Sequence, residues 1–394
     1  MELVTKNTSD LIPYVNNSRT HNEEQINQII SSIKEFGFTN PILIEQDNGI
    51  IAGHGRIMAA KKMGLKEVPC VIVKGLTKTQ IKALNIADNQ IALNAGWDLD
   101  KLKLEIQGLN EDSFNLDTLG FTKNQIDDFL FEEKQGLTDD DEVPDVKPED
   151  IKSKLGDIWI LGNHRLVCGD SINENDVKLL MNNSIAKMVN TDPPYGINYQ
   201  SNMRVKSEKF DVIENDNQIL DICPIIQKYS EGWVFIWTTW KVLTIWIENT
   251  KLFGYPTNMV VWHKGGGGIG DLKKTFSTDY EMALVFNRGS VLKGKRIGSV
   301  WKIAKDNATD YKHPTQKPVE LAKEAIQKTS DINDIVLDLF AGSGSTLIAC
   351  EKIKRKCYTM EFDPKYCDTI IQRWQNFTGK EAIHEQTGKR YNEI

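Results

Sequence analysis

The chain has 394 residues, of which 40% are apolar and 26% charged, proportions typical of a soluble globular protein with two domains. It has no run approaching the roughly 20 apolar residues of a membrane helix, no signal-peptide pattern and no metal-ligand spacing among its dispersed cysteines and histidines, so a reduced, cytoplasmic protein without metal or disulfides is expected. The net charge of −7 does not exclude a nucleic-acid partner, because the acidic and basic side chains concentrate in different segments.

The first 135 residues predict a small α/β unit with a helical annex. Asn22 is suited to cap an amphipathic helix that Gly37 ends. A strand (PILIEQ), a turn (DNG), a strand–glycine turn–helix (IIAGHGRIMAAKKMG) and another strand (VPCVIV) follow. Residues 80–133 have a helical pattern, with breaks expected near Gly96, Gly108 and Gly120.

Residues 136–150, GLTDDDEVPDVKPED, hold seven acidic side chains, one basic side chain and two prolines. Such a composition is typical of a solvated connection between domains. The sequence therefore predicts an acidic linker that separates two independently folding units.

Residues 151–394 predict an open α/β sheet with both faces covered by helices. The segment IWILGNHRLVCGD reads as two short strands around a Gly162-Asn163 hairpin turn. Further strands are expected at WVFIW, NMVVW, MALVF and IVLDLF, and several of them are separated by helical patterns.

Two motifs in this second unit carry chemistry. The strand-like run IAKMV leads into DPPY at 192–195, where two prolines end the strand and hold the backbone rigid. Far downstream, IVLDLF leads into AGSGST, whose glycines at 342 and 344 let a ligand approach the start of a helix. Glu361, at the end of the next strand, can accept both hydroxyls of a ribose. A purely structural glycine turn is the alternative, and Leu347 at the third motif position opposes a nicotinamide dinucleotide.

DPPY, HPTQKP at 313–318 and LDLFAGSGST at 337–346 occur in the order found in beta-class DNA amino-methyltransferases, and the second unit resembles that family over about residues 156–379. The resemblance implies a Rossmann-like fold with circularly permuted motifs, S-adenosylmethionine as cofactor and double-stranded DNA as substrate. It also implies a target-recognition insert at about 200–312.

The resemblance also implies the site residues. The catalytic motif is Asp192, Pro193, Pro194 and Tyr195. The cofactor-binding positions are Asp170, Thr315, Lys317, Asp338, Phe340, Ala341, Gly342, Ser343, Gly344, Glu361 and Phe362. Asp170 would contact the cofactor's adenine amine, with helix capping as its alternative role, and Thr315 and Lys317 would lie near the methionine carboxylate.

The catalytic motif suits an exocyclic amine, which is a poor nucleophile because its lone pair is delocalised into the base. Asp192 can accept one N–H of the amine and the carbonyl of Pro193 can accept the other. Held in this way, the nitrogen becomes more nearly tetrahedral and aims its lone pair at the methyl group. Tyr195 can stack on a base flipped out of the duplex.

Residues 264–305 hold nine basic and three acidic side chains around a GGGG run. Clustered bases on flexible backbone suit contact with DNA phosphates, and solvated loops are the alternative. The expected DNA-binding residues are Lys273, Lys274, Lys293, Lys295 and Arg296.

Within the first unit, GIIAGHGRIMAAKKMG resembles the N-terminal domain of ParB-like and sulfiredoxin-like proteins, over about residues 5–94. The resemblance implies a nucleotide-phosphate site at Gly53, His54, Gly55 and Arg56. His54 and Gly55 replace the acid and first arginine of partition proteins, which argues against CTP hydrolysis.

Together these features predict a DNA methyltransferase acting on adenine N6, because Asp192 is the motif residue more typical of adenine enzymes. Cytosine N4 stays open as the alternative target. A different class, a ParB-like DNA-binding module with an inactive methylase half, is opposed by the intact DPPY and G-x-G motifs. Asparagine would be expected at 192 in a protein glutamine methyltransferase. A solitary or prophage-type methylase fits the absence of a nuclease motif, and a homodimer stays open.

Overall fold

The computed structural model describes residues 1–15, 19–94, 96–196, 219–266, 276, 278–293, 296–304 and 316–394. The chain divides into two compact units, residues 1–130 and 131–394. Each has its own sheet and its own apolar core.

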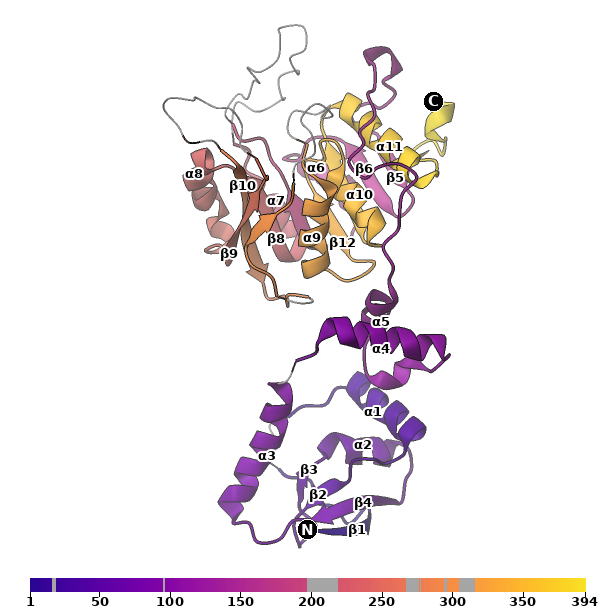
Figure 1. Ribbon diagram of the computed structural model, residues 1–394, viewed down its shortest axis with the longest axis vertical. Coiled ribbons are helices and arrows are strands. Elements are labelled where there is room, and N and C mark those ends of the chain that lie inside the picture. The colour runs from indigo at the N-terminus through magenta and orange to yellow at the C-terminus, as the bar shows by residue number, and fades with distance from the viewer. Residues whose placement is uncertain are drawn as a thin grey trace. The chain divides into compact units, whose positions relative to one another are not determined.

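The first unit is a four-stranded sheet with helices (Figure 1). The strand order is β1-β4-β2-β3, in which β1 pairs antiparallel with β4 and β4 pairs parallel with β2. Its elements are β1 (Glu2–Asn7), α1 (Glu23–Phe36), β2 (Ile42–Ile44), β3 (Ile50–Ala52), α2 (His54–Lys62), β4 (Glu67–Ile72), α3 (Lys78–Leu93), α4 (Leu99–Glu111), η1 (Leu116–Leu119) and α5 (Lys123–Leu130).

Local sequence patterns in the first unit predict most of its helices and strands. Asn22 caps α1 by accepting the N–H of Gln25, and Gly37 ends that helix at a φ of 74°. The sequence analysis does not predict strand β1. The expected break near Gly108 is wrong, because α4 runs through it. An interior glycine costs a helix about 1 kcal/mol, and the cluster around Ile106, Leu116 and Ile126 offsets that cost.

The second unit confirms the predicted α/β fold. Its ten-stranded sheet has the order β11-β9-β10-β8-β7-β12-β13-β6-β5-β14. The five central strands from β8 to β6 run parallel, whereas β10 is antiparallel to β8 and β5 is antiparallel to β6. The β5–β6 hairpin turns at Gly162 as expected.

The strands of this sheet are β5 (Ile158–Leu161), β6 (His164–Cys168), β7 (Ala186–Thr191), β8 (Ser230–Thr238), β9 (Asn258–His263), β10 (Tyr280–Arg288), β11 (Val300–Lys302), β12 (Ile335–Asp338), β13 (Lys356–Glu361) and β14 (Ile383–His384). Its helices are η2 (Pro148–Asp150), α6 (Glu174–Met181), α7 (Cys223–Tyr229), η4 (Trp240–Val242), α8 (Leu243–Asn249), η5 (Thr250–Phe253), α9 (Val319–Thr329), α10 (Ser345–Lys352), α11 (Pro364–Thr378) and η6 (Tyr391–Glu393).

Two expected boundaries need correction. An insert at 200–312 is too wide, because β8, β9, β10 and β11 all belong to the main sheet, where their apolar side chains are buried. Residues 136–150 are not a free linker. They pack on the second unit, with Val143 and Val146 buried and the N–H of Leu137 bonded to the carbonyl of Phe377.

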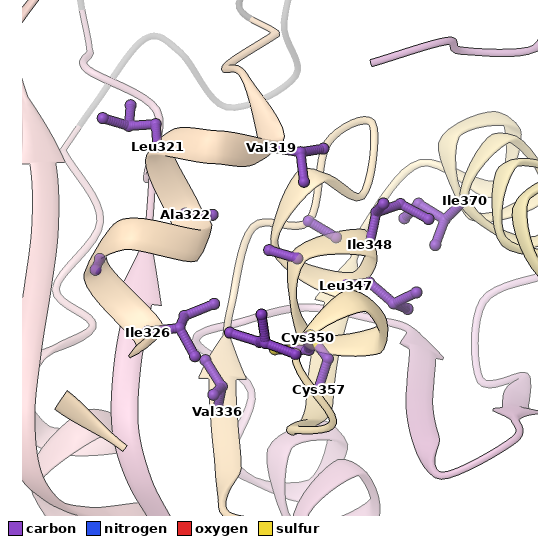
Figure 2. Close-up of a cluster of buried hydrophobic side chains, with 14 of the residues drawn as sticks. Val319, Leu321, Ala322, Ile326, Val336, Leu347, Ile348, Cys350, Cys357 and Ile370 are labelled. Atoms are coloured by element: carbon purple, nitrogen blue, oxygen red, sulfur yellow. The ribbon is translucent and has the colours of Figure 1, made fainter. Parts of the chain in front are cut away.

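Apolar side chains from α9, α10, β12, β13 and α11 meet in one core beside the predicted cofactor loop (Figure 2). Val319, Leu347 and Ile370 lie in this core and fix the segments that carry the motifs. All six cysteines are free thiols and buried, with Cys70 in the first unit and the other five in the second. None of the described helices combines the length and apolarity needed to cross a membrane.

Candidate active site

The predicted acids meet at one edge of the second sheet. Asp192 follows β7, Asp338 ends β12 and Glu361 ends β13. Because these strands are parallel, their carboxyl ends share an edge, as does the turn after β6 that carries Asp170. Strand β7 leads to β8 on one side and β12 leads to β13 on the other. The crevice of such a sheet therefore lies between β7 and β12.

The glycine turn after β12 has the predicted form. Gly344 is the N-cap of α10 in the left-handed region, at a φ of 84°, and no side chain caps that helix. The N–H of Gly342 donates to Oε2 of Glu361 at 2.8 Å. Burial raises the pKa values of Glu361 and Asp338 to about 7 each. Both carboxyls therefore change charge near neutral pH.

Other cofactor-loop residues also lie at this edge. Asp170 accepts the N–H of Ile172 in the turn after β6, whereas Asn173 caps the following helix α6, so the alternative role of helix capping is not observed for Asp170. Ser343 and Ala341 are buried, Phe340 packs against the core, and Phe362 is 36% exposed. Thr315 lies outside the described residues.

Asp192 lies in a network of polar side chains. Tyr195 donates its hydroxyl to Oδ1 of Asp192 at 2.9 Å, and Lys317 forms an ion pair with Oδ2. Burial raises the pKa of Asp192, and the Lys317 ammonium opposes that shift. Burial alone would lower the pKa of Lys317, but Asp192 and Glu281 outweigh it and raise that pKa. The ammonium therefore stays charged and favours the carboxylate form of Asp192.

A second carboxylate, Glu281, completes this network. It accepts from Lys317 at 3.2 Å and from Lys264 at 2.5 Å. Burial would raise the pKa of Glu281, but the two ammonium groups outweigh it and lower that pKa to about 2. Glu281 reaches this edge because β10 is antiparallel to β8, so its amino end lies beside the carboxyl ends of the parallel strands.

The expected position of Lys317 near the methionine carboxylate of the cofactor stays a prediction. Its ammonium lies between Asp192 and Glu281 in this structure. Asp192 and Glu281 are both partly buried, and two such carboxylates attract an ammonium more strongly than solvent-exposed carboxylates would. Lys317 therefore belongs to the catalytic motif's surroundings in this structure.

The expected DNA-binding residues are only partly described. Lys273, Lys274 and Lys295 lie outside the described residues. Lys293 pairs with Asp331 at 2.6 Å, and Arg296 is exposed. Of these two, Arg296 is the more available for a phosphate contact.

In the first unit, Gly53 is the N-cap of α2 at a φ of 102°. Arg56 donates from Nη1 to the carbonyls of Asn40 and Pro41, at 2.6 and 3.0 Å. His54 accepts the N–H of Tyr14 at 3.2 Å, and burial, followed by the nearby His21, lowers its pKa. The glycine turn therefore carries one cation held by backbone and one neutral histidine.

Sequence reasoning did not identify Glu281, Lys264 or the residues of the 136–150 segment as neighbours of the site. An acid at the start of an apolar strand is a weak signal, and the antiparallel direction of β10 could not be read from the sequence. Within the described residues, no group of three or more His, Cys, Asp or Glu side chains could hold a metal ion.

Family comparisons match three segments of the chain, and the third crosses the boundary between the two units. Residues 186–373 match a DNA methylase family of the N6/N4 type, residues 2–90 match the ParB N-terminal domain, and residues 100–155 match the ParB-methyltransferase HTH domain. The last match covers α4, α5 and the acidic segment, and sequence reasoning had described its helices only as an annex.

Three curated relatives illustrate the two halves. The ParB-like nuclease domain-containing protein YnaK of Escherichia coli is 46% identical over 80 residues, 20% of this chain and 92% of the relative. The type II methyltransferase M.BglII of Bacillus subtilis is 25% identical over 257 residues, 53% of this chain and 68% of the relative. The DNA adenine methyltransferase YhdJ of Escherichia coli is 25% identical over 222 residues, 47% of this chain and 75% of the relative. The chain therefore carries a domain of the N6/N4 DNA methylase type, for which S-adenosylmethionine is the cofactor, and a ParB-like domain ahead of it.

Proposed function

We propose that the chain transfers a methyl group from S-adenosylmethionine to the N6 amine of adenine in double-stranded DNA. The main support for this proposal is the position of Asp192 at the carboxyl end of β7. It lies directly before the carbonyl of Pro193 and is paired with Lys317. An ionised carboxylate and a rigid carbonyl are the two acceptors that an exocyclic amine needs.

The described residues fit the cofactor. Glu361 presents a carboxyl at the end of β13, and its present partners, the N–H groups of Gly342 and Asp363, show that it accepts from donors on the loop side. We assign Glu361 to the ribose hydroxyls and the Gly342–Gly344 turn to the close approach of the ligand. The cofactor would supply an electrophilic methyl group, and Asp192 would hold the amine that receives it.

Adenine is favoured over cytosine by Asp192 and by the relative named as an adenine methyltransferase. A nucleotide at the ParB-like domain belongs to the same proposal, because Arg56 is a cation at a glycine turn.

The test is incubation of the full chain with S-adenosylmethionine and unmethylated genomic DNA, followed by nucleoside mass spectrometry. N6-methyladenosine in the deoxy form is expected. Formation of N4-methyldeoxycytidine instead would overturn the choice of base. The absence of both products would overturn the proposed methyltransferase activity. Long-read methylome sequencing of the product would then give the recognition site.

A further inference from the structure

Residues 131–146, here called the acidic strap, follow a fixed course over the methylase unit. The N–H of Leu137 donates to the carbonyl of Phe377 at 2.9 Å, and Val143 and Val146 are buried. A Cβ at Gly136 would lie 2.0 Å from the ring of Phe377, so glycine is required for this close approach. The acidic strap is therefore packed on the methylase unit as an ordered part of it.

Ion pairs hold the strap at two further points. Glu133 pairs with Lys323 at 3.0 Å and with Lys352 at 2.8 Å, and Asp140 also pairs with Lys352. Pairs that are partly exposed stabilise little one by one. Their joint effect is to keep the acidic residues against α9 and α10.

Asp141 makes the contacts that reach the active site. Its Oδ1 accepts the N–H of Val319, the first residue of α9, at 2.9 Å. The N-cap of that helix is Pro318, which offers no side-chain cap, so Asp141 supplies the missing acceptor and a negative charge from outside the helix. The carbonyl of Asp141 accepts from Gln316 at 2.8 Å. Two bonds from one residue therefore bracket Lys317.

Arg373 connects the strap to the glycine loop. It is 2% exposed and donates to the carbonyl of Asp140 at 2.7 Å and to that of Ser343 at 2.8 Å. Burial lowers its pKa to about 10, against the opposing effect of Asp141, so it stays charged at neutral pH. The hydroxyl of Ser345 in turn donates to the carbonyl of Lys317 at 2.7 Å. Strap, loop and the segment around Lys317 form one hydrogen-bonded unit.

We propose that Asp141 is a positioning residue for methyl transfer, which holds Lys317 against Asp192 by capping α9. This inference rests on the proposed function of Asp192. It makes the acidic strap, which lies inside the segment that matches the ParB-methyltransferase HTH domain, a working part of the catalytic centre. A conformational change that pulls on the strap would then alter the charge environment of Asp192.

The first test compares full-length Asp141→Ala with Asp145→Ala, a matched change at an exposed acid of the same strap. We expect Asp141→Ala to lower the single-turnover methylation rate about tenfold or more, because small misplacements of catalytic groups have effects of this size. Asp141→Asn, which keeps the capping oxygen, should recover most of the rate. Equal rates for Asp141→Ala and Asp145→Ala would overturn the proposal.

The pH profile separates positioning from a general loss of structure. If Lys317 moves away from Asp192, the pKa of Asp192 rises and the acidic limb of the rate profile shifts to higher pH in Asp141→Ala. Lys317→Met should shift it in the same direction, and the double variant should be no worse than Lys317→Met alone. An unshifted limb, or fully additive losses, would show that Asp141 does not act through Lys317.

A third readout does not depend on activity. Hydrogen exchange in the peptide that contains Val319 should be faster in Asp141→Ala than in wild type or Asp145→Ala, because the capped N–H loses its acceptor. Unchanged exchange would overturn the proposal even in an active enzyme. If the wild-type protein does not methylate DNA but the exchange difference is present, the proposed function fails and the capping contact stands.

Discussion

Two strand–glycine–helix turns in this chain have nearly the same backbone. Gly53 joins β3 to α2 and Gly344 joins β12 to α10, at φ values of 102° and 84°. Neither helix has a side-chain N-cap bond. Each turn therefore leaves helix N–H groups available to a ligand, and the backbone alone does not distinguish what each turn binds.

The side chains around the two turns differ. Carboxyls with raised pKa values, Asp338 and Glu361, lie at the second turn, whereas Arg56 and a largely neutral His54 lie at the first. Carboxylates suit the hydroxyls of a nucleoside, and a guanidinium suits phosphate. The comparison teaches that a glycine motif identifies a place of close approach, and neighbouring charges identify the ligand.

The largest effect is expected from Asp192→Ala. Methyl transfer should fall at least about 10²–10³-fold, because an acceptor for the target amine is lost. Affinity for S-adenosylmethionine, measured by calorimetry, should change little. Near-normal turnover would contradict the proposed role of Asp192 as an acceptor for the amine.

A substitution at each glycine turn tests the division of ligands directly. Gly342→Val should remove measurable S-adenosylmethionine binding, because the branched side chain enters the approach space of the ligand. Gly53→Ala is the control in the other turn and should leave that binding unchanged. Loss of cofactor affinity in Gly53→Ala, or its retention in a folded Gly342→Val, would break the comparison.

Cofactor affinity should also depend on pH. The raised pKa of Glu361, about 7, means that its carboxylate form is lost as pH falls through neutrality. Affinity should therefore rise from pH 6 towards pH 8, by up to about tenfold per unit below the pKa. Glu361→Gln should bind weakly with a flat profile, and a wild-type profile that falls over this range would contradict the assignment.

The smallest effect on methylation is expected from Arg56→Ala. It should weaken any nucleotide binding by the full chain, measured with CTP as the probe, roughly tenfold, as expected for loss of a hydrogen bond to a charged group. Single-turnover methylation with saturating DNA should be nearly unchanged. A collapse of the chemical step would mean that the first turn serves the reaction itself.

Much of the fold could be predicted because local patterns and tertiary contacts agree. The capped α1, the β5–β6 hairpin and the strand–turn–helix at Gly344 all have unambiguous residues. The course of residues 136–150 could not be predicted. Their acidic composition is typical of a solvated linker, and only the fold brings Arg373 and Lys352 to meet them.

The same reasoning applies to the site. Asp192, Asp338 and Glu361 follow apolar strands, so a parallel sheet must place them at one edge. Glu281 arrives from an antiparallel strand, and Lys317 turns towards the carboxylates, and both outcomes depend on strand direction and local charge. Sequence motifs therefore predicted the acids better than their counter-ions.

Chemical labelling of the buried cysteines would report unfolding of the chain. Burial raises the pKa of Cys70 in β4 and that of Cys223 in α7, to about 12 in the second case, and alkylating reagents attack the thiolate form. Modification should therefore wait for each thiol to be exposed by opening of its own unit. Because Cys70 belongs to the first unit and the other five thiols to the second, mass spectrometry of pulse-labelled peptides would time the two halves separately in one sample, without an added probe.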